Sequence, residues 1–159
     1  MYRLLWLRLG DKSGYTMRFG SINASYGVAF LGGEKQVWLF RDIELLRSFT
    51  ASDVPLAQQW RSLGQRWHWP LPLPTDADRF DHHDFHVTLR QNRFGDLGAR
   101  IGWCSEIAAE FALHCELPEV LDLLDEVPGP KPTTFSVHRW RQIIPLLASC
   151  VLVWDEHAR

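Results

Sequence analysis

The first third of the chain shows short apolar segments separated by turn residues. These segments fall at residues 1–9, 15–20, 26–33 and 35–41, and the turns between them contain glycine or asparagine. Both residue types readily adopt the backbone conformations of tight turns. The pattern is typical of an antiparallel meander, and it predicts four strands at the start of the chain.

Two helices are predicted after this meander. The side chain of Asp42 can accept from the free amides of a first helical turn, which predicts a helix over residues 43–49. A second helix follows Asp53, with Pro55 in the first turn, where a missing N–H is tolerated. We expect its core side to carry four apolar residues at helical spacing, Leu56, Trp60, Leu63 and Trp67.

Residues 97–117 show the most sustained alternation in the chain. Most odd positions are apolar and several even positions are charged. Alternation with a period of two residues puts one face of a strand in the core and the other face in water. We therefore predict a long strand that bends near Gly102 and pairs in a hairpin with residues 85–91. The alternative is a helix through residues 105–115, because alanine and glutamate favour helices. Its apolar face would contain Ile107, Ala108, Phe111 and Cys115.

The end of the chain predicts a short acidic helix and a final strand. Pro118 opens this helix and Pro128 stops it. Residues 150–154 are apolar and predict the last strand, whereas residues 133–150 combine a serine suited to cap a helix with an interior proline and receive no assignment. Together the elements predict a single α+β domain over residues 1–159, with an antiparallel β-sheet and helices packed on one face.

Composition narrows the class of protein. A chain of 159 residues with 46% apolar content can fold around one core. Its net charge of −2 lacks the positive excess that nucleic-acid binding uses, so no nucleic-acid partner is expected. No apolar run reaches the length of a bilayer span, and the first segment is interrupted by Arg8 and has no small-residue cleavage site. We therefore predict a cytoplasmic protein with no membrane partner.

The three cysteines do not form a recognisable motif. Cys104, Cys115 and Cys150 are too few and too scattered for a disulfide framework or a Cys-x-x-Cys zinc site, and we expect thiols in the core. Cys104 falls on the outward side of the predicted strand. No phosphate-binding loop or nucleophile motif is present, so we expect no cofactor.

Histidines and acids gather within residues 78–91. On an extended strand, His82, Asp84 and His86 point to one face, with roughly 7 Å between successive side chains. Neighbours at this spacing can chelate, and His114 on the predicted partner strand could complete a metal site. The alternative is that these residues are the solvated entry to an ordinary strand.

The same segment contains the sequence His-Val-Thr-Leu, from His86 to Leu89. It resembles one half of the signature of the two-histidine phosphoesterases, in which a pair of such strands places two imidazoles around a phosphodiester. One imidazole acts as base and the other as acid. This chain has one copy, because neither His114 nor His138 continues with the required hydroxyl residue. The alternative function is thus a small hydrolase, metal-dependent or phosphodiesterase-like, that uses the histidine cluster.

Carboxylates give the main functional hypothesis. Glu106, Glu110 and Glu116 would line the polar side of the predicted strand, and Asp122 and Asp125 follow in the acidic helix. Such a surface can meet a basic partner, since complementary charge speeds encounter and suppresses wrong pairings. Solvated charge without a partner is the alternative interpretation.

The order of the segments resembles that of the small immunity proteins that bacteria keep in the cytosol. The resemblance is one of layout, carried by the predicted hairpin at residues 85–103, the run at 105–117 and the acidic segment at 118–127. It implies a non-catalytic binding protein that neutralises a cognate toxin in a one-to-one complex. The five carboxylates would be the contacts, and the sequence does not indicate an oligomeric state.

Overall fold

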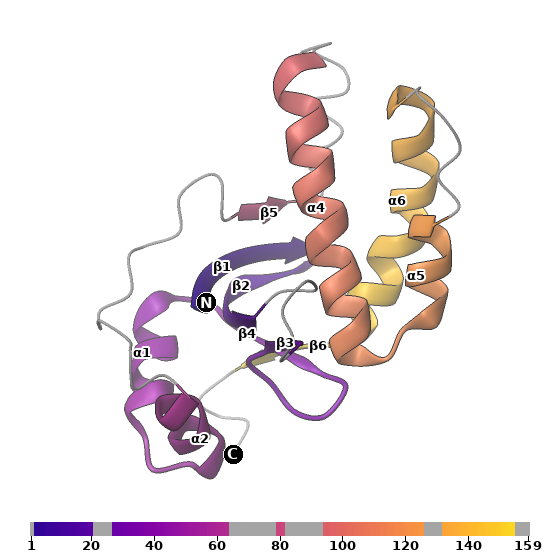
Figure 1. Ribbon diagram of the computed structural model, residues 1–159. Helices are drawn as coiled ribbons and strands as arrows, with labels where there is room; N and C mark the ends of the chain where they lie inside the picture. The colour runs from indigo at the N-terminus through magenta and orange to yellow at the C-terminus, as the bar shows by residue number, and fades with distance from the viewer. Residues whose placement is uncertain (1, 21–26, 64–78, 82–93, 126–131, 155–159) are drawn as a thin grey trace.

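The computed structural model describes residues 2–20, 27–63, 79–81, 94–125 and 132–154. Within these ranges the chain forms an α+β domain (Figure 1). The strands are β1 (Tyr2–Leu9), β2 (Lys12–Gly20), β3 (Val28–Phe30), β4 (Val37–Phe40), β5 (Arg79–Asp81) and β6 (Val151–Trp154). The helices are α1 (Ile43–Ala51), α2 (Pro55–Leu63), α4 (Phe94–Cys115), α5 (Pro118–Asp125) and α6 (Pro132–Ser149). None of these helices is both long enough and apolar enough to cross a bilayer.

The described strands form one six-stranded sheet in the order β5-β1-β2-β4-β6, with β3 beside β2. The meander prediction is confirmed, since β2 is antiparallel to β1, β3 and β4. The sheet is mixed, however, because β5 lies parallel to β1 and β6 lies parallel to β4. The predicted purely antiparallel sheet is therefore wrong. Turn residues predict an antiparallel orientation for two strands that a tight turn joins. They do not predict the orientation of strands that are separated by a long segment of chain.

Helices pack on both faces of the sheet instead of on one. Successive side chains of a strand point to opposite faces, and in this sheet both sets are apolar. Leu5 and Leu39 belong to a buried cluster with residues of α4, α5 and α6, whereas Leu4 and Phe40 belong to a second cluster with residues of α1 and α2. Figure 1 shows these two groups of helices on different sides of the sheet.

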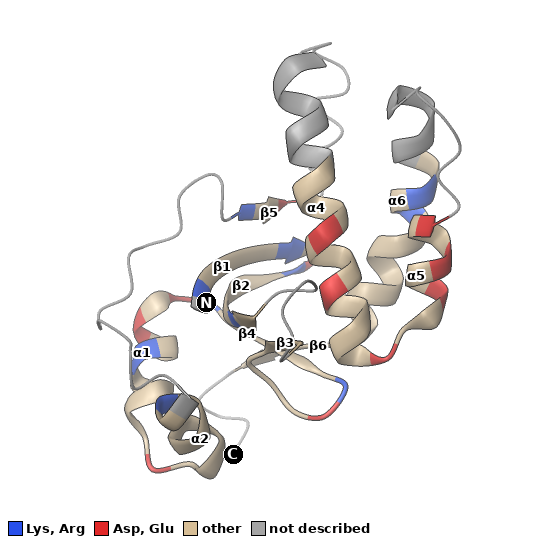
Figure 2. Cartoon of the chain, in the orientation of Figure 1, with Lys and Arg blue, Asp and Glu red and all other residues tan. Residues whose placement is uncertain are grey.

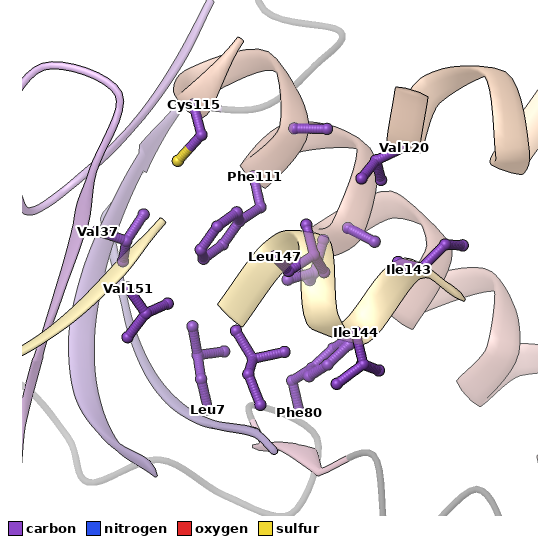
Figure 3. Close-up of a cluster of buried hydrophobic side chains, with 14 of the residues drawn as sticks. Leu7, Val37, Phe80, Phe111, Cys115, Val120, Ile143, Ile144, Leu147 and Val151 are labelled. Carbon is purple, nitrogen blue, oxygen red and sulfur yellow. The ribbon is translucent and has the colours of Figure 1, made fainter. Parts of the chain in front are cut away.

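The larger cluster joins elements from the whole length of the chain. Figure 3 shows Phe111 of α4, Ile143 and Leu147 of α6 and Val151 of β6 around one buried space. Most of this cluster is aliphatic or aromatic side chain, and burial of such surface stabilises a fold by about 25 cal/mol per Å². The C-terminal half of the chain therefore supplies the side chains that pack against the buried residues of β1 and β4.

Residues 97–117 do not form a strand. They lie almost entirely in α4, and the predicted hairpin with residues 85–91, which are outside the described part, is wrong because its partner is helical. Burial follows the period of a helix: Glu110 at an even position is fully buried, whereas Leu113 at an odd position is 44% exposed. The segment is helical, as the alternative interpretation from its alanine and glutamate content predicted, and its alternation of apolar and polar residues did not indicate a strand.

The other helices agree with the local signals. The Asp42 carboxylate accepts from the Leu45 amide at 2.8 Å and caps α1, as predicted. Pro55 opens α2, and Pro118 opens α5. Residues 132–149, most of which received no assignment, form α6, and Pro145 lies inside this helix at an exposed position.

Gly32 gives a test of the close packing between β3 and β4. A Cβ built at Gly32 would lie 2.0 Å from the carbonyl oxygen of Gln36, whereas one at Gly33 would meet nothing closer than 3.8 Å. We predict that Gly32→Ala lowers the free energy of unfolding by about 1–3 kcal/mol, because the backbone must move to admit the methyl group. Gly33→Ala is the matched control and should change it by less than about 1 kcal/mol. Urea unfolding of both variants measures the difference, and equal effects would contradict this account of the turn.

Candidate functional site

Two of the predicted partner contacts lie on successive turns of α4, facing β2. Arg18 of β2 pairs through Nη2 with Oε1 of Glu110, and the same nitrogen lies 3.5 Å from Oε1 of Glu106. The Arg18 side chain is 7% exposed and that of Glu110 is fully buried, whereas that of Glu106 is 45% exposed. Glu110 is therefore not a contact for a partner, and this part of the prediction is wrong.

The position of Glu110 follows from the helix. Residues four apart lie on the same side of a helix, so Glu106 and Glu110 point together toward the sheet. A buried carboxylate is stable only beside a countercharge and hydrogen-bond donors, and Arg18 on the facing strand provides both. The pair fixes α4 over β2 and has a structural role.

Glu116 lies at the corner between α4 and α5. It has a left-handed backbone conformation, with φ of 53°, and the Leu117 amide beyond it donates to the Ala112 carbonyl at 2.8 Å, which ends the helix in the usual way. Its carboxylate pairs with Lys35 Nζ at 2.7 Å, and this hydrogen bond raises the pKa of Lys35. Both side chains are exposed, so the pair links the surface of α4 to the turn before β4.

The exposed acids of α5 form a ridge together with Glu116 in the turn before the helix. We use the name acidic ridge for Glu116, Glu119, Asp122 and Asp125, which follow one another at intervals of three residues and are all exposed. Side chains three apart are neighbours on a helix surface. Val120, on the other side of α5, is buried in the core, so the helix has one apolar and one acidic side (Figure 2).

Within the described residues, no ion pair neutralises Glu119, Asp122 or Asp125. Glu119 was not among the predicted contacts. The segment was predicted to be helical, so the spacing of three residues between Glu119 and both Glu116 and Asp122 was a signal that could have identified it. The predicted acidic helix is confirmed, whereas the acidic strand predicted before it is wrong, because those residues form α4.

His114 does not serve the predicted metal site. Its ring is half-buried between α4 and the first strands, where the Phe30 amide donates to Nδ1 at 3.4 Å and Nε2 lies 3.2 Å from the Gln36 carbonyl. The neutral tautomer with its proton on Nε2 satisfies both contacts, so neither nitrogen is available to a metal. The other three predicted ligands, His82, Asp84 and His86, lie outside the described residues.

No group of three or more histidine, cysteine, aspartate or glutamate side chains in the described part of the chain is placed to hold a metal ion. Cys104, which the strand prediction placed on the outside, is buried on α4. The metal-dependent alternative thus stays a prediction about residues 82–86 alone.

A cavity of about 490 Å³ lies beside α1, on the other face of the sheet. Its wall includes Phe49 and Trp154, whose rings belong to an aromatic cluster with Trp38 and Phe40. Trp38 and Trp154 have ring centroids 4.9 Å apart. The polar groups of the wall are two serines and Asp53. The sequence did not predict this cavity, because α1 and β6 are joined only in the folded chain.

Comparison with known proteins gives one structural likeness. No protein family model and no curated protein matches the chain. The C-terminal domain of SatS, whose crystal structure was solved in complex with bromine, is similar at a TM-score of 0.45 and 16% identity, over 96% of this chain and 94% of that domain. At this score the likeness does not establish a shared fold or function.

The buried ion pair predicts unequal effects for the two glutamates of α4. Glu110→Ala leaves the Arg18 guanidinium buried without its nearest countercharge and should lower the free energy of unfolding by about 3–5 kcal/mol. Glu106→Ala removes a half-exposed partner and should cost about 1 kcal/mol or less. Urea unfolding monitored by circular dichroism compares the two variants. Similar losses would show that Glu110 is not the main partner of Arg18.

His114 predicts a loss of stability in acid. Burial lowers the pKa of His114 from its ordinary value of 6.5, with a smaller opposing effect from the hydrogen bond to Gln36. The folded state then binds a proton more weakly than the unfolded state, so this contribution is fully present above pH 6.5 and is lost as the pH falls below it, by at most about 1.4 kcal/mol per pH unit.

The measurement is urea unfolding at pH 8 and pH 5. His114→Gln keeps a neutral donor and acceptor that does not titrate. Between pH 8 and pH 5 the free energy of unfolding should therefore fall more for the wild type than for this variant. His138→Gln changes an exposed histidine of α6 and should keep the pH dependence of the wild type. If the free energies of unfolding of the wild type and His114→Gln differ by the same amount at both pH values, His114 is not the source of the loss of stability in acid.

Proposed function

We propose that this chain is a non-catalytic cytoplasmic binding protein of the immunity type, which holds a basic toxin domain against the acidic ridge. The observation that carries the proposal is the set of exposed carboxylates of Glu119, Asp122 and Asp125 on one side of α5, which have no ion-pair partner among the described residues. Glu116, in the turn before α5, extends this set, and its carboxylate is paired with Lys35. The contacts are then Glu116, Glu119, Asp122 and Asp125, and Glu110 is excluded by burial.

The ridge is held in a fixed geometry. Val120 is buried and Leu121, Leu123 and Leu124 pack against the main core. Arg139 of α6 also donates through Nη1 to the Leu123 carbonyl at 3.1 Å. A helix anchored in this way presents its carboxylates without prior rearrangement, which reduces the ordering that binding requires.

The spacing of the ridge suits a surface rich in arginine or lysine. From Glu119 to Asp125 the helix rises about 9 Å, at 1.5 Å per residue. This distance is similar to the screening length of about 8 Å at physiological ionic strength, so the charges act together on an approaching partner. Their main effect should be on the rate of association and on its dependence on salt.

The alternative function, a small hydrolase, now depends on fewer residues. His114 is occupied by backbone groups of Phe30 and Gln36, so the metal or phosphodiesterase hypothesis rests on His82, Asp84 and His86. Measurement of the metal content of the purified protein, and a phosphodiesterase assay with His86→Ala as control, would distinguish this alternative. Stoichiometric metal or an activity lost with His86 would favour it over the binding protein.

The ridge gives a test of the proposed function. The binding partner in the test is the protein encoded by the neighbouring reading frame, provided that it is a toxin domain with a basic surface. Replacing three acids, as Glu119→Gln, Asp122→Asn and Asp125→Asn, should weaken binding by about tenfold or more, mostly through slower association, and should flatten its salt dependence. Surface plasmon resonance at several salt concentrations measures both effects.

A second triple variant controls for net charge. Asp11→Asn, Glu44→Gln and Asp53→Asn remove the same number of exposed acids at positions away from α5. This variant should bind and protect cells from the toxin as the wild type does. Equal weakening by the two triple variants, or no binding to the neighbouring protein, would overturn the proposal.

A further inference from the structure

One side of α1 lines the cavity of about 490 Å³. The residues of α1 and its C-terminal cap that form this part of the wall are Leu45, Ser48, Phe49 and Ser52. Positions three and four apart share one side of a helix, so this side carries two apolar side chains and two hydroxyls. Trp154 of β6 also lines the cavity, and its ring centroid lies 5.1 Å from that of Phe49. An early helix and the last strand therefore meet at one site.

The aromatic rings of the wall are held in place by the sheet. The ring centroid of Trp154 lies 4.9 Å from that of Trp38 and 5.7 Å from that of Phe40, both on β4. Phe49 is buried and contacts the same two rings, with centroid distances of 5.7 and 5.3 Å. Rings that are fixed by such mutual packing need little ordering when a ligand binds, which favours affinity.

Two adjacent polar residues of the wall present hydrogen-bond acceptors. The Ser52 hydroxyl donates its one hydrogen to the Phe49 carbonyl at 2.7 Å, so its oxygen is left with lone pairs only. The Asp53 carboxylate is exposed, and no ion pair between described residues includes it. An ionised carboxylate accepts hydrogen bonds and donates none. A ligand that fits these two groups must therefore supply donors, and the charge of Asp53 favours a cation.

The corner between α1 and α2 places these acceptors. Arg61 of α2 donates through Nη1 to the carbonyls of Thr50 and Ser52, at 2.5 and 2.6 Å, and so ties the second helix to the end of the first. Arg61 is not one of the residues that line the cavity, whereas Asp53 and Val54 are. The guanidinium is thus directed at backbone carbonyls, and the carboxylate is the charged group of the wall.

We propose that this cavity binds a small organic cation of the arylalkylammonium class, in which a short alkyl chain joins an aromatic group to a protonated amine. The cavity volume lies within the range of small-molecule sites, roughly 300–1,000 Å³, and such sites are mostly apolar with a few placed polar groups. The aromatic group packs against Phe49 and Trp154, and the ammonium donates to Ser52 Oγ and to the Asp53 carboxylate. The indole ring also attracts the positive charge.

The proposed site is separate from the acidic ridge. Phe49 belongs to the buried cluster of α1 and α2, whereas Val120 of α5 belongs to the cluster on the other face of the sheet. The inference therefore goes beyond the proposed function and does not depend on it.

The test titrates the folded full-length protein at neutral pH with 2-phenylethylamine, whose amine is then protonated, and with 2-phenylethanol, which has a similar shape and no charge. The NMR resonance of the Trp154 indole N–H, assigned through Trp154→Phe, reports on the cavity. The amine should shift this resonance to saturation and bind about threefold or more tighter than the alcohol, because an ion pair and a cation–π contact are added. The anion 3-phenylpropionate should bind more weakly than the alcohol.

Two variants make the result specific to the carboxylate of the wall. Asp53→Asn keeps the shape of an exposed side chain and should weaken binding of the amine by about threefold, with a much smaller effect on the alcohol. Asp11→Asn removes an exposed acid in the turn between β1 and β2 and should change neither affinity. Equal affinities for amine and alcohol, equal effects of the two variants, or a Trp154 resonance that the amine does not shift would overturn the proposal.

Discussion

The buried pair of Arg18 and Glu110 is the contact on which the arrangement of this protein depends. It joins the second strand to the longest helix across the layer between sheet and helices, where the other buried residues are mostly apolar. A charge in such a place is unfavourable unless its partner is present, so the pair is specific in a way that apolar contacts are not. It selects one rotation of α4 about its axis. With that rotation, Phe111 and Cys115 face the core and Glu106 lies near its edge.

The position of α4 determines which residues of the C-terminal half are exposed. The left-handed residue Glu116 turns the chain into α5, whose buried side meets the same core. The acids of α5 then point to water as a consequence of that burial. The charges of α4 and α5 thus lie in different environments: the buried one of α4 helps to fix the fold, and those of α5 are exposed to solvent. A sequence with the same number of acids on one continuous face would not separate these environments.

Local signals predicted much of the fold, and they did so where the structure is determined locally. The meander of β1 to β4, the Asp42 cap of α1, the proline that opens α5 and the last strand all depend on neighbouring residues. The error at α4 came from a segment whose apolar residues satisfy both periods. The burial of Glu110 decides between them, but it depends on Arg18, which is 92 positions away. The directions of β5 and β6 depend on equally distant pairings and could not be read from turns. For the candidate site, the acidic helix after Pro118 was predicted from the sequence, whereas the burial of Glu110 was missed because residues 97–117 were predicted as a strand.

The position of β6 at the sheet edge has a consequence for synthesis of the protein. Until the ribosome has released residues 151–154, β4 has no neighbour on that side, and the apolar side chains of Val37 and Leu39 lack part of their cover. An incomplete nascent chain would therefore carry an exposed edge strand, which is a template for pairing with other chains. Completion of the sheet must await the synthesis of β6, because the parallel pairing joins residues 37–40 to residues 151–154, and contacts so distant in sequence form slowly.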